Sequence, residues 1–190
     1  MYKLKVISST VRPGRKGPII AKWITETAQN HGSFEAELLD LGEINLPLMN
    51  EAIHPMLKKY EHEHTKKWSA KIEEADAFIF VTSEYNHSYP ASLKNALEYL
   101  VHEWAYKPAG IVSYSAGPFA GIRGALNLKN DLLPLKTIAL AEAVYIPALN
   151  HFVNSEGIFV PNELINNSAK LMLTQLVRWT KGLKSIKENP

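Results

Sequence analysis

A basic loop that carries hydroxyl groups, near the amino terminus, has the composition of an anion-binding site. It contains Ser9, Thr10, Arg12 and Arg15, and Gly17 closes it just before an expected helix. Hydroxyls, free backbone N–H groups and the positive end of a helix dipole can bind a phosphate together, and arginine adds paired donors. The loop is neither a Walker A motif nor a G-x-G-x-x-G motif, so the same composition also fits a solvated surface turn.

A second loop, residues 83–90, is rich in aromatic and polar side chains. It includes Glu84, Tyr85, Asn86 and His87. These residues could hold a flat heteroaromatic ring, with donors and acceptors from Asn86 and the backbone at its edge and tyrosine lining it. The alternative is a tyrosine-rich turn that packs on its own helix and binds nothing.

A third loop, residues 115–121, begins with Ser115, Ala116 and Gly117. Its small side chains leave the backbone open to close approach by a ligand. Taken alone, this loop predicts little.

The elements that must position these loops alternate between strand and helix about five times. Short β-rich or apolar runs predict strands over 3–8, 34–41, 77–82, 109–114 and 143–146. Apolar residues at helical spacing predict helices over about 18–31, within 56–72, over 90–101, from about 121 to 136, and after 161. This alternation indicates a doubly wound parallel sheet with helices on both faces, whose ligands bind beyond the carboxyl ends of the strands.

Composition narrows the possible chemistry. The 190 residues include no cysteine, so thiolate zinc sites, disulfides and cysteine nucleophiles are excluded. The net charge of +2 is too small to predict a nucleic-acid partner, and no apolar run approaches membrane-spanning length. We therefore expect one domain over residues 1–190, in the cytoplasm, with neither a nucleic-acid nor a membrane partner.

Three stretches together resemble the NADPH-dependent FMN reductase family, which includes quinone and azo reductases. They are Ser9-Thr10-Val11-Arg12, Glu84-Tyr85-Asn86, and the helical segment Leu93-Lys94-Asn95-Ala96-Leu97-Glu98-Tyr99-Leu100. The similarity extends over roughly residues 3–150, and the second motif with its helix is the most specific part of it.

The resemblance implies a flavodoxin-like sheet of five parallel strands in the order 2-1-3-4-5, with FMN as cofactor and NADPH or NADH as co-substrate. It places the FMN phosphate at Thr10, Arg12 and the backbone near Gly17. The flavin ring would border residues 84–86, mainly through backbone groups, and residues 115–117 would lie along its pyrimidine side. Electrons would pass to a quinone, azo compound or flavin, and no side chain need act as catalytic acid or base. Members of the family are commonly homodimers, so we expect a homodimer or a higher homo-oligomer, with Trp104 and Tyr106 as candidate contacts.

Two departures from the family pattern concern the loops. Serine stands at positions 9 and 83, where the family often has glycine and proline respectively. Pro118 has no N–H, so one contact of the third loop with the flavin is in question.

Other functions are compatible with parts of the sequence. An FMN-binding electron carrier or regulatory module would not turn over nicotinamide, although the basic composition disfavours an electron carrier. A hydrolase would recruit Ser88 or Ser92 with His87 or His102, but the chain has no G-x-S-x-G motif.

Three histidines, His54, His62 and His64, are better explained as a solvated polar face than as metal ligands. Arg123 could hold a nucleotide phosphate, but a surface arginine at a helix start is the simpler interpretation.

Overall fold

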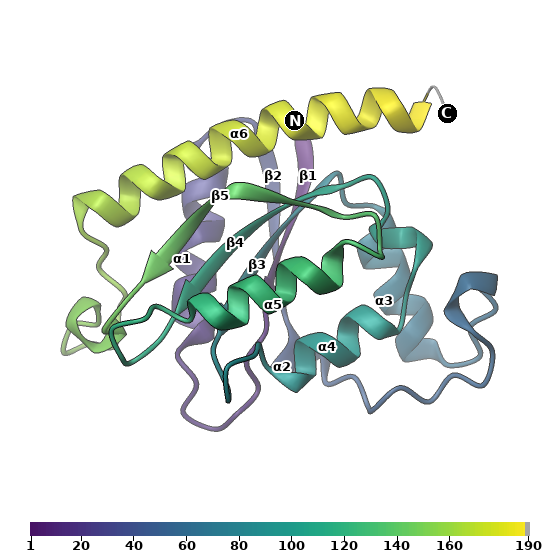
Figure 1. Ribbon diagram of the computed structural model, residues 1–190, viewed down its shortest axis with the longest axis horizontal. Helices are drawn as coiled ribbons and strands as arrows, with labels where there is room; N and C mark the ends of the chain where they lie inside the picture. The colour runs from purple at the N-terminus through teal and green to yellow at the C-terminus, as the bar shows by residue number, and fades with distance from the viewer. Residues whose placement is uncertain (189–190) are drawn as a thin grey trace.

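Five parallel strands form the centre of the molecule (Figure 1). The computed structural model describes residues 1–188. The strands are β1 Tyr2–Ser8, β2 Phe34–Asp40, β3 Ala77–Ser83, β4 Pro108–Tyr114 and β5 Ile138–Ile146. Their order is β2-β1-β3-β4-β5 and every pairing is parallel. The strand order and direction confirm the predicted fold.

Helices connect successive strands and cover both faces of the sheet (Figure 1). The α-helices are α1 Gly17–Asn30, α2 Leu41–Ile44, α3 Glu63–Glu73, α4 Ala91–Glu98, α5 Ile122–Leu132 and α6 Glu163–Glu188. Short 3-10 helices cover Pro55–Leu57, His102–Trp104 and Leu149–Phe152. Within residues 1–188, none of the helices combines the length and apolar character that crossing a membrane requires.

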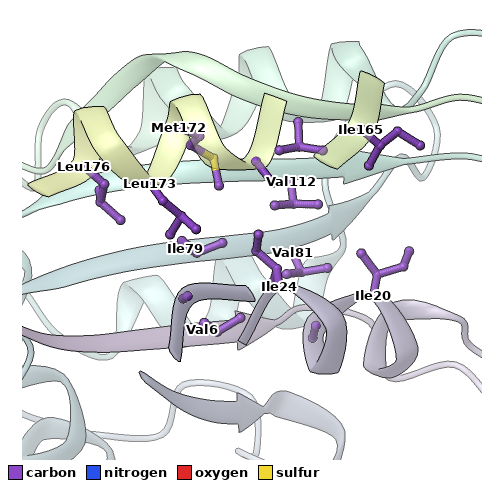
Figure 2. Close-up of a cluster of buried hydrophobic side chains, with 14 of the residues drawn as sticks. Val6, Ile20, Ile24, Ile79, Val81, Val112, Ile165, Met172, Leu173 and Leu176 are labelled. Carbon is purple, nitrogen blue, oxygen red and sulfur yellow. The ribbon is translucent and has the colours of Figure 1, made fainter. Parts of the chain in front are cut away.

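Side chains along the central strands point alternately to the two faces of the sheet, which divides the core into two layers. On β3, Ile79 and Val81 belong to the layer under α1 and α6, whereas Phe78 and Phe80 belong to the layer under α3, α4 and α5. Figure 2 shows the first layer, in which Ile24 of α1 and Leu173 of α6 point toward the same strands. Because β3 is buried on both faces, it appears in the sequence as an unbroken apolar run.

Two predicted boundaries on the last strand and the helix before it are wrong. Helix α5 ends at Leu132 instead of near 136, and β5 begins at Ile138 instead of 143. Lys136 has a positive φ of 56°, which a helix cannot continue through, and the Thr137 N–H donates to the Leu132 carbonyl. The first half of β5 gives a weak strand signal because three of its five residues are Ala or Glu, which have low β propensity, and its pairing with β4 shifts register there.

The predicted role of Trp104 as a subunit contact is wrong. Its side chain is fully buried and packs edge-on against Trp68, with ring centres 6.0 Å apart, and its ring centre lies 5.0 Å from that of Phe78. Burial inside one chain leaves no surface for a second one. Tyr106, two residues later, is exposed.

Candidate functional site

The loop after β1 contacts the ends of both β3 and β4. The N–H of Ser9 donates to the carbonyl of Val81 at 3.0 Å, which joins the loop to β3. The hydroxyl of Thr10 lies 3.3 Å from that of Tyr114, the last residue of β4. The arrows of β4 and β5 point toward this edge in Figure 1. The carboxyl end of the sheet is therefore where the candidate residues gather, as expected for a doubly wound sheet.

Three hydroxyl groups converge on the first residue of α1, Gly17. A Cβ atom there would lie 2.4 Å from Thr10 Oγ1, 3.0 Å from the Tyr114 hydroxyl and 3.2 Å from Ser8 Oγ. Pro18 follows in the first helical turn, where its missing N–H costs no hydrogen bond. Residue 17 must therefore be glycine, because these three hydroxyl oxygens lie too close to leave room for a Cβ atom. The amino terminus of α1 thus lies beside three hydroxyl groups. We call this arrangement the cradle.

Two buried hydroxyls, one in the cradle and one beside it, have no partner in the part of the chain that the structure describes. Ser8 Oγ and Ser9 Oγ are buried, and neither has a hydrogen-bond partner within residues 1–188. Burial without a partner costs about 1–3 kcal/mol per group, so such hydroxyls favour a polar ligand. Burial raises the pKa of Tyr114 to about 12, so its phenol keeps its proton at neutral pH.

The two predicted arginines of the first loop have different surroundings. Arg12 is exposed, and its guanidinium carbon lies 5.8 Å from the centre of the Tyr85 ring, so the first loop also reaches the second. Arg15 instead forms an ion pair with Asp40 at 2.5 Å and donates to the carbonyl of Thr10 at 3.0 Å. Arg12 is free to meet an anion, whereas Arg15 braces the loop against the end of β2.

The second loop contains a tight turn. Tyr85 N donates to the Ser88 carbonyl at 2.7 Å, and Ser88 N donates to the Tyr85 carbonyl at 3.0 Å. The two residues between them, Asn86 and His87, have positive φ values of 49° and 66°. Asparagine tolerates this conformation better than most residues, which gives Asn86 a conformational role in addition to any contact with a ligand. His87 is exposed, and its carbonyl accepts a hydrogen bond from Asn127.

Glu84 joins the second loop to the start of α5. Its carboxylate accepts hydrogen bonds from the Arg123 N–H and guanidinium, both at 3.1 Å. Burial acts to raise the pKa of Glu84, but these bonds, together with one from the Gly124 N–H, outweigh it and lower the pKa below 4.5. Arg123 is therefore engaged with Glu84 in this structure.

The third loop is held by a segment that the sequence did not indicate. Ser115 N donates to the Ile146 carbonyl at 3.2 Å, and the Ala148 N–H donates to the Gly117 carbonyl at 2.9 Å. Ala116, between Ser115 and Gly117, is exposed. The link after β5 thus fixes the shape of the predicted loop.

Two of the side chains that a hydrolase would use, Ser92 and His102, are engaged in the fold. The Ser92 hydroxyl donates to the Ser9 carbonyl, and His102 Nε2 lies 2.9 Å from the Met56 carbonyl, so both groups serve the fold. Within residues 1–188, no three His, Cys, Asp or Glu side chains are grouped closely enough to hold a metal ion.

A hollow of about 650 Å³ adjoins the second loop. Tyr85, Asn86, Ser88 and Tyr89 form one side of it, and residues of α4 form another. The cradle suits a phosphate, and Arg12 links it to the second loop, whose turn at Tyr85 and Asn86 could border a ring, so the residues present fit a flavin mononucleotide.

The sequence analysis missed two residues that shape the site, Tyr114 and Asp40. Tyr114 ends an apolar strand and appears there as a core residue, although strand ends at this edge are where ligands bind. Asp40 ends β2 and could have been suspected for the same reason. Its partner Arg15 lies 25 positions away in the chain.

The all-parallel sheet in the order 2-1-3-4-5, with a hydroxyl-lined cradle at the carboxyl end of its strands, defines a flavodoxin-like α/β protein. Residues 2–151 match the sequence model of the NADPH-dependent FMN reductases. The chain therefore belongs to that family.

Individual relatives agree with this assignment. The chain is 46% identical over 114 residues to an NAD(P)H-dependent FMN reductase of Schizosaccharomyces pombe, covering 59% of this chain and 57% of that one. It is 32% identical over 162 residues to a quinone reductase of Pseudomonas putida, covering 82% and 83% of the two chains. Among solved structures, the flavoenzyme NAD(P)H:acceptor oxidoreductase FerB of Paracoccus denitrificans superposes with a TM-score of 0.78 at 25% identity, over 96% of this chain and 98% of FerB.

Proposed function

We propose that this protein is an NAD(P)H-dependent FMN reductase that passes electrons from nicotinamide to bound FMN and on to a small acceptor, with residues 1–190 acting as one domain. The observation that carries the proposal is the cradle, in which three hydroxyls surround the amino terminus of a helix, while Ser8 Oγ in it and Ser9 Oγ beside it are buried without a partner within residues 1–188. Family membership and the names of the relatives support the same activity.

The cradle residues would hold the phosphate of FMN. Thr10 and Ser9 offer hydroxyls, the backbone at Gly17 offers an N–H, and Arg12 adds a cation from the exposed side of the loop. Tyr114 braces Thr10 from β4. Arg15 would act indirectly, since Asp40 already engages it.

The second and third loops would hold the flavin ring. The turn at Tyr85 and Asn86 would border the ring with its backbone, while Glu84 fixes the turn to α5. Ser115, Ala116 and Gly117 would lie along the pyrimidine side, with Ser115 Oγ donating to the Gly117 carbonyl at 2.9 Å.

When bound, FMN supplies two-electron chemistry, taking hydride from NAD(P)H and reducing an acceptor. The protein positions the ring, keeps one ring face accessible and fixes the phosphate. No ionisable side chain of the site is required to exchange a proton with the substrates.

Turnover distinguishes this enzyme from an FMN-binding carrier. Protein loaded with FMN should oxidise NADPH rapidly when a simple quinone is added, and Arg12→Ala should lose activity at limiting FMN. A carrier would bind FMN but show almost no NADPH oxidation. Such a result would contradict the proposal.

Assembly and location complete the proposal. We expect a homodimer in the cytoplasm, as is common among similar proteins. Large apolar side chains stand exposed around the third loop and α5, at Phe119, Ile122, Leu126 and Leu133, and could be covered by a second copy. Sedimentation velocity that yields only a monomer would contradict the dimer.

A further inference from the structure

The connection between α2 and α3, residues 45–62, is an irregular segment that is fixed in place. We call it the strap. Its middle is clamped by two residues of the helical motif singled out in the sequence, Asn95 and Tyr99. Asn95 Nδ2 donates to the Pro47 carbonyl at 2.7 Å, and the Met49 N–H donates to Asn95 Oδ1 at 2.8 Å.

Tyr99 adds a second set of contacts. Its hydroxyl lies 3.1 Å from the Pro47 carbonyl, 3.3 Å from the Leu48 carbonyl and 3.0 Å from Asn50 Oδ1. The backbone on both sides of Leu48 is therefore held by hydrogen bonds. The motif that marks the family most specifically thus has a structural task here, which is to hold the strap on α4.

Further along, the strap is held again. Glu103 is fully buried, and its Oε1 accepts hydrogen bonds from the hydroxyls of Tyr60 at 2.8 Å and Ser69 at 2.7 Å. An 18-residue connection is therefore held at its middle and near its far end.

Leu48 is 82% exposed although its backbone is fixed. It lines the 650 Å³ hollow together with Tyr85 and Asn86, the turn proposed to border the flavin. An apolar side chain held at this hollow adds apolar surface for a ligand ring to contact.

The charges of the hollow further limit its ligand. Lys94 lies 3.1 Å from Asp131 and 3.7 Å from Glu98, and the Tyr89 hydroxyl also donates to Asp131. The single lysine is thus offset by two carboxylates. An anionic ligand would be repelled, whereas an uncharged ring would not.

We propose that Leu48 is a specificity-determining residue at this hollow and that it sets how strongly an uncharged acceptor is preferred over an anionic one. The inference rests on the proposed function, whose acceptors include quinones, and adds to it the residue that selects among them. In this half of the reaction the quinone gains two electrons and two protons and leaves as hydroquinone. The electrons come from NAD(P)H by way of bound FMN, and water supplies the balancing proton.

The test follows the re-oxidation of reduced, FMN-loaded protein by stopped flow. The acceptors are 1,4-naphthoquinone and its 2-sulfonate, in wild type, Leu48→Lys and Leu48→Asp. Leu57→Lys and Leu57→Asp are matched controls, because Leu57 is 61% exposed on the same strap but does not line the hollow.

The wild type should prefer the neutral quinone. Leu48→Lys should raise the second-order rate constant for the sulfonate about fivefold, and Leu48→Asp should lower it by a similar factor. Both Leu48 variants should change the rate constant for the neutral quinone less than about twofold, because an uncharged molecule is neither attracted nor repelled by the new charge. The Leu57 variants should behave as wild type with both acceptors.

Three results would overturn the inference. The first is an unchanged sulfonate preference in the Leu48 variants, or an equal change in the Leu57 variants. The second is an effect confined to reduction by NADPH, which would make the hollow a nucleotide site. The third is a change of oligomeric state in the Leu48 variants, which would place this side chain against a second copy.

Failure of the proposed function looks different. In that case wild-type protein with bound FMN would not be reduced by NADPH at all. Reducing the flavin with dithionite still allows the re-oxidation step to be measured, so the role of Leu48 is tested either way.

Discussion

A buried lysine toward the amino end of the sheet is paired with carboxylates, whereas two buried serine hydroxyls at the carboxyl end have no partner within residues 1–188. Toward the amino end, Lys5 is buried and pairs with both Glu37 and Glu74, and Lys184 pairs with Asp76 at 2.7 Å. At the carboxyl end, Ser8 Oγ and Ser9 Oγ have no partner within residues 1–188, and Arg12 is exposed.

This difference separates groups that hold the fold from groups left for a ligand. Charges that satisfy one another stabilise the sheet and have little capacity left for other molecules. Hydroxyls that are buried and unpaired cost stability, and a ligand that binds them removes that cost. Substitutions at the two ends should therefore affect different measurements.

The largest effect on ligand binding is expected from Gly17→Ala. Alanine suits a helix better than glycine, but its Cβ would lie 2.4 Å from Thr10 Oγ1 and occupy the cradle. We expect the Kd of FMN, measured by calorimetry, to rise at least about 100-fold.

Gly182→Ala is the matched control, because a Cβ there meets no atom within 4 Å. It should leave FMN binding unchanged and retain or raise the melting temperature. Normal FMN affinity in Gly17→Ala would show that the cradle is not the phosphate site.

Arg12→Ala should have the next largest effect. Loss of an exposed cation beside a phosphate is expected to raise the Kd of FMN about 10- to 30-fold, with melting temperature unchanged. Arg178→Ala, an exposed arginine on α6, should change neither quantity. If the two variants weakened FMN binding equally, a general effect of net charge would explain the result.

Lys5→Met tests the amino end of the sheet. The lysine is buried, whereas Glu37 and Glu74 are partly exposed and can be solvated when it is removed. We expect a loss of about 1–2 kcal/mol in the free energy of unfolding, measured in urea, and no change in FMN affinity. Lys22→Met, at an exposed helical position, should cost less than about 0.5 kcal/mol. A lower FMN affinity in Lys5→Met would contradict the view that paired groups toward the amino end of the sheet serve stability and not ligand binding.

The smallest effect is expected for Glu84→Gln, and it depends on pH. The pKa of Glu84 is lowered in the folded protein, so its ion pair with Arg123 stabilises the fold above the unfolded pKa. This contribution, about 0.5–1 kcal/mol because Arg123 is partly exposed, is lost as pH falls through the lower folded value. Melting temperatures of wild type and Glu84→Gln should differ at pH 7 and converge below about pH 4. A constant difference at all pH values would show that the charge is not responsible.

Much of the fold could be predicted from the sequence because local patterns coincide with it. The run at β3 is apolar on both faces, so this strand is placed correctly, and the apolar stripe of α4 predicts its start but not its end, which is Glu98 instead of residue 101. The start of β5 is not predicted, because its alanines and glutamate give a weak strand signal and the register shift interrupts its pairing.

The sequence predicts which loops form the site, but it does not predict which side chains contact one another there. Residue types pointed to the loops that carry Thr10 and Tyr85. Nothing local to Arg15 indicates that Asp40 engages it, and nothing local to Tyr114 indicates that its hydroxyl reaches Thr10. Contacts between distant parts of the chain depend on the three-dimensional packing of the sheet, which spacing along the sequence does not encode.

The most direct test of the account compares the binding of FMN and riboflavin to the wild-type protein by calorimetry. The two ligands differ only in the phosphate, so a cradle built for that group predicts an FMN affinity at least about 100-fold higher, with the difference falling as salt is added. Equal affinities for FMN and riboflavin, or no binding of either, would contradict the claim that the hydroxyls around Gly17 hold a phosphate.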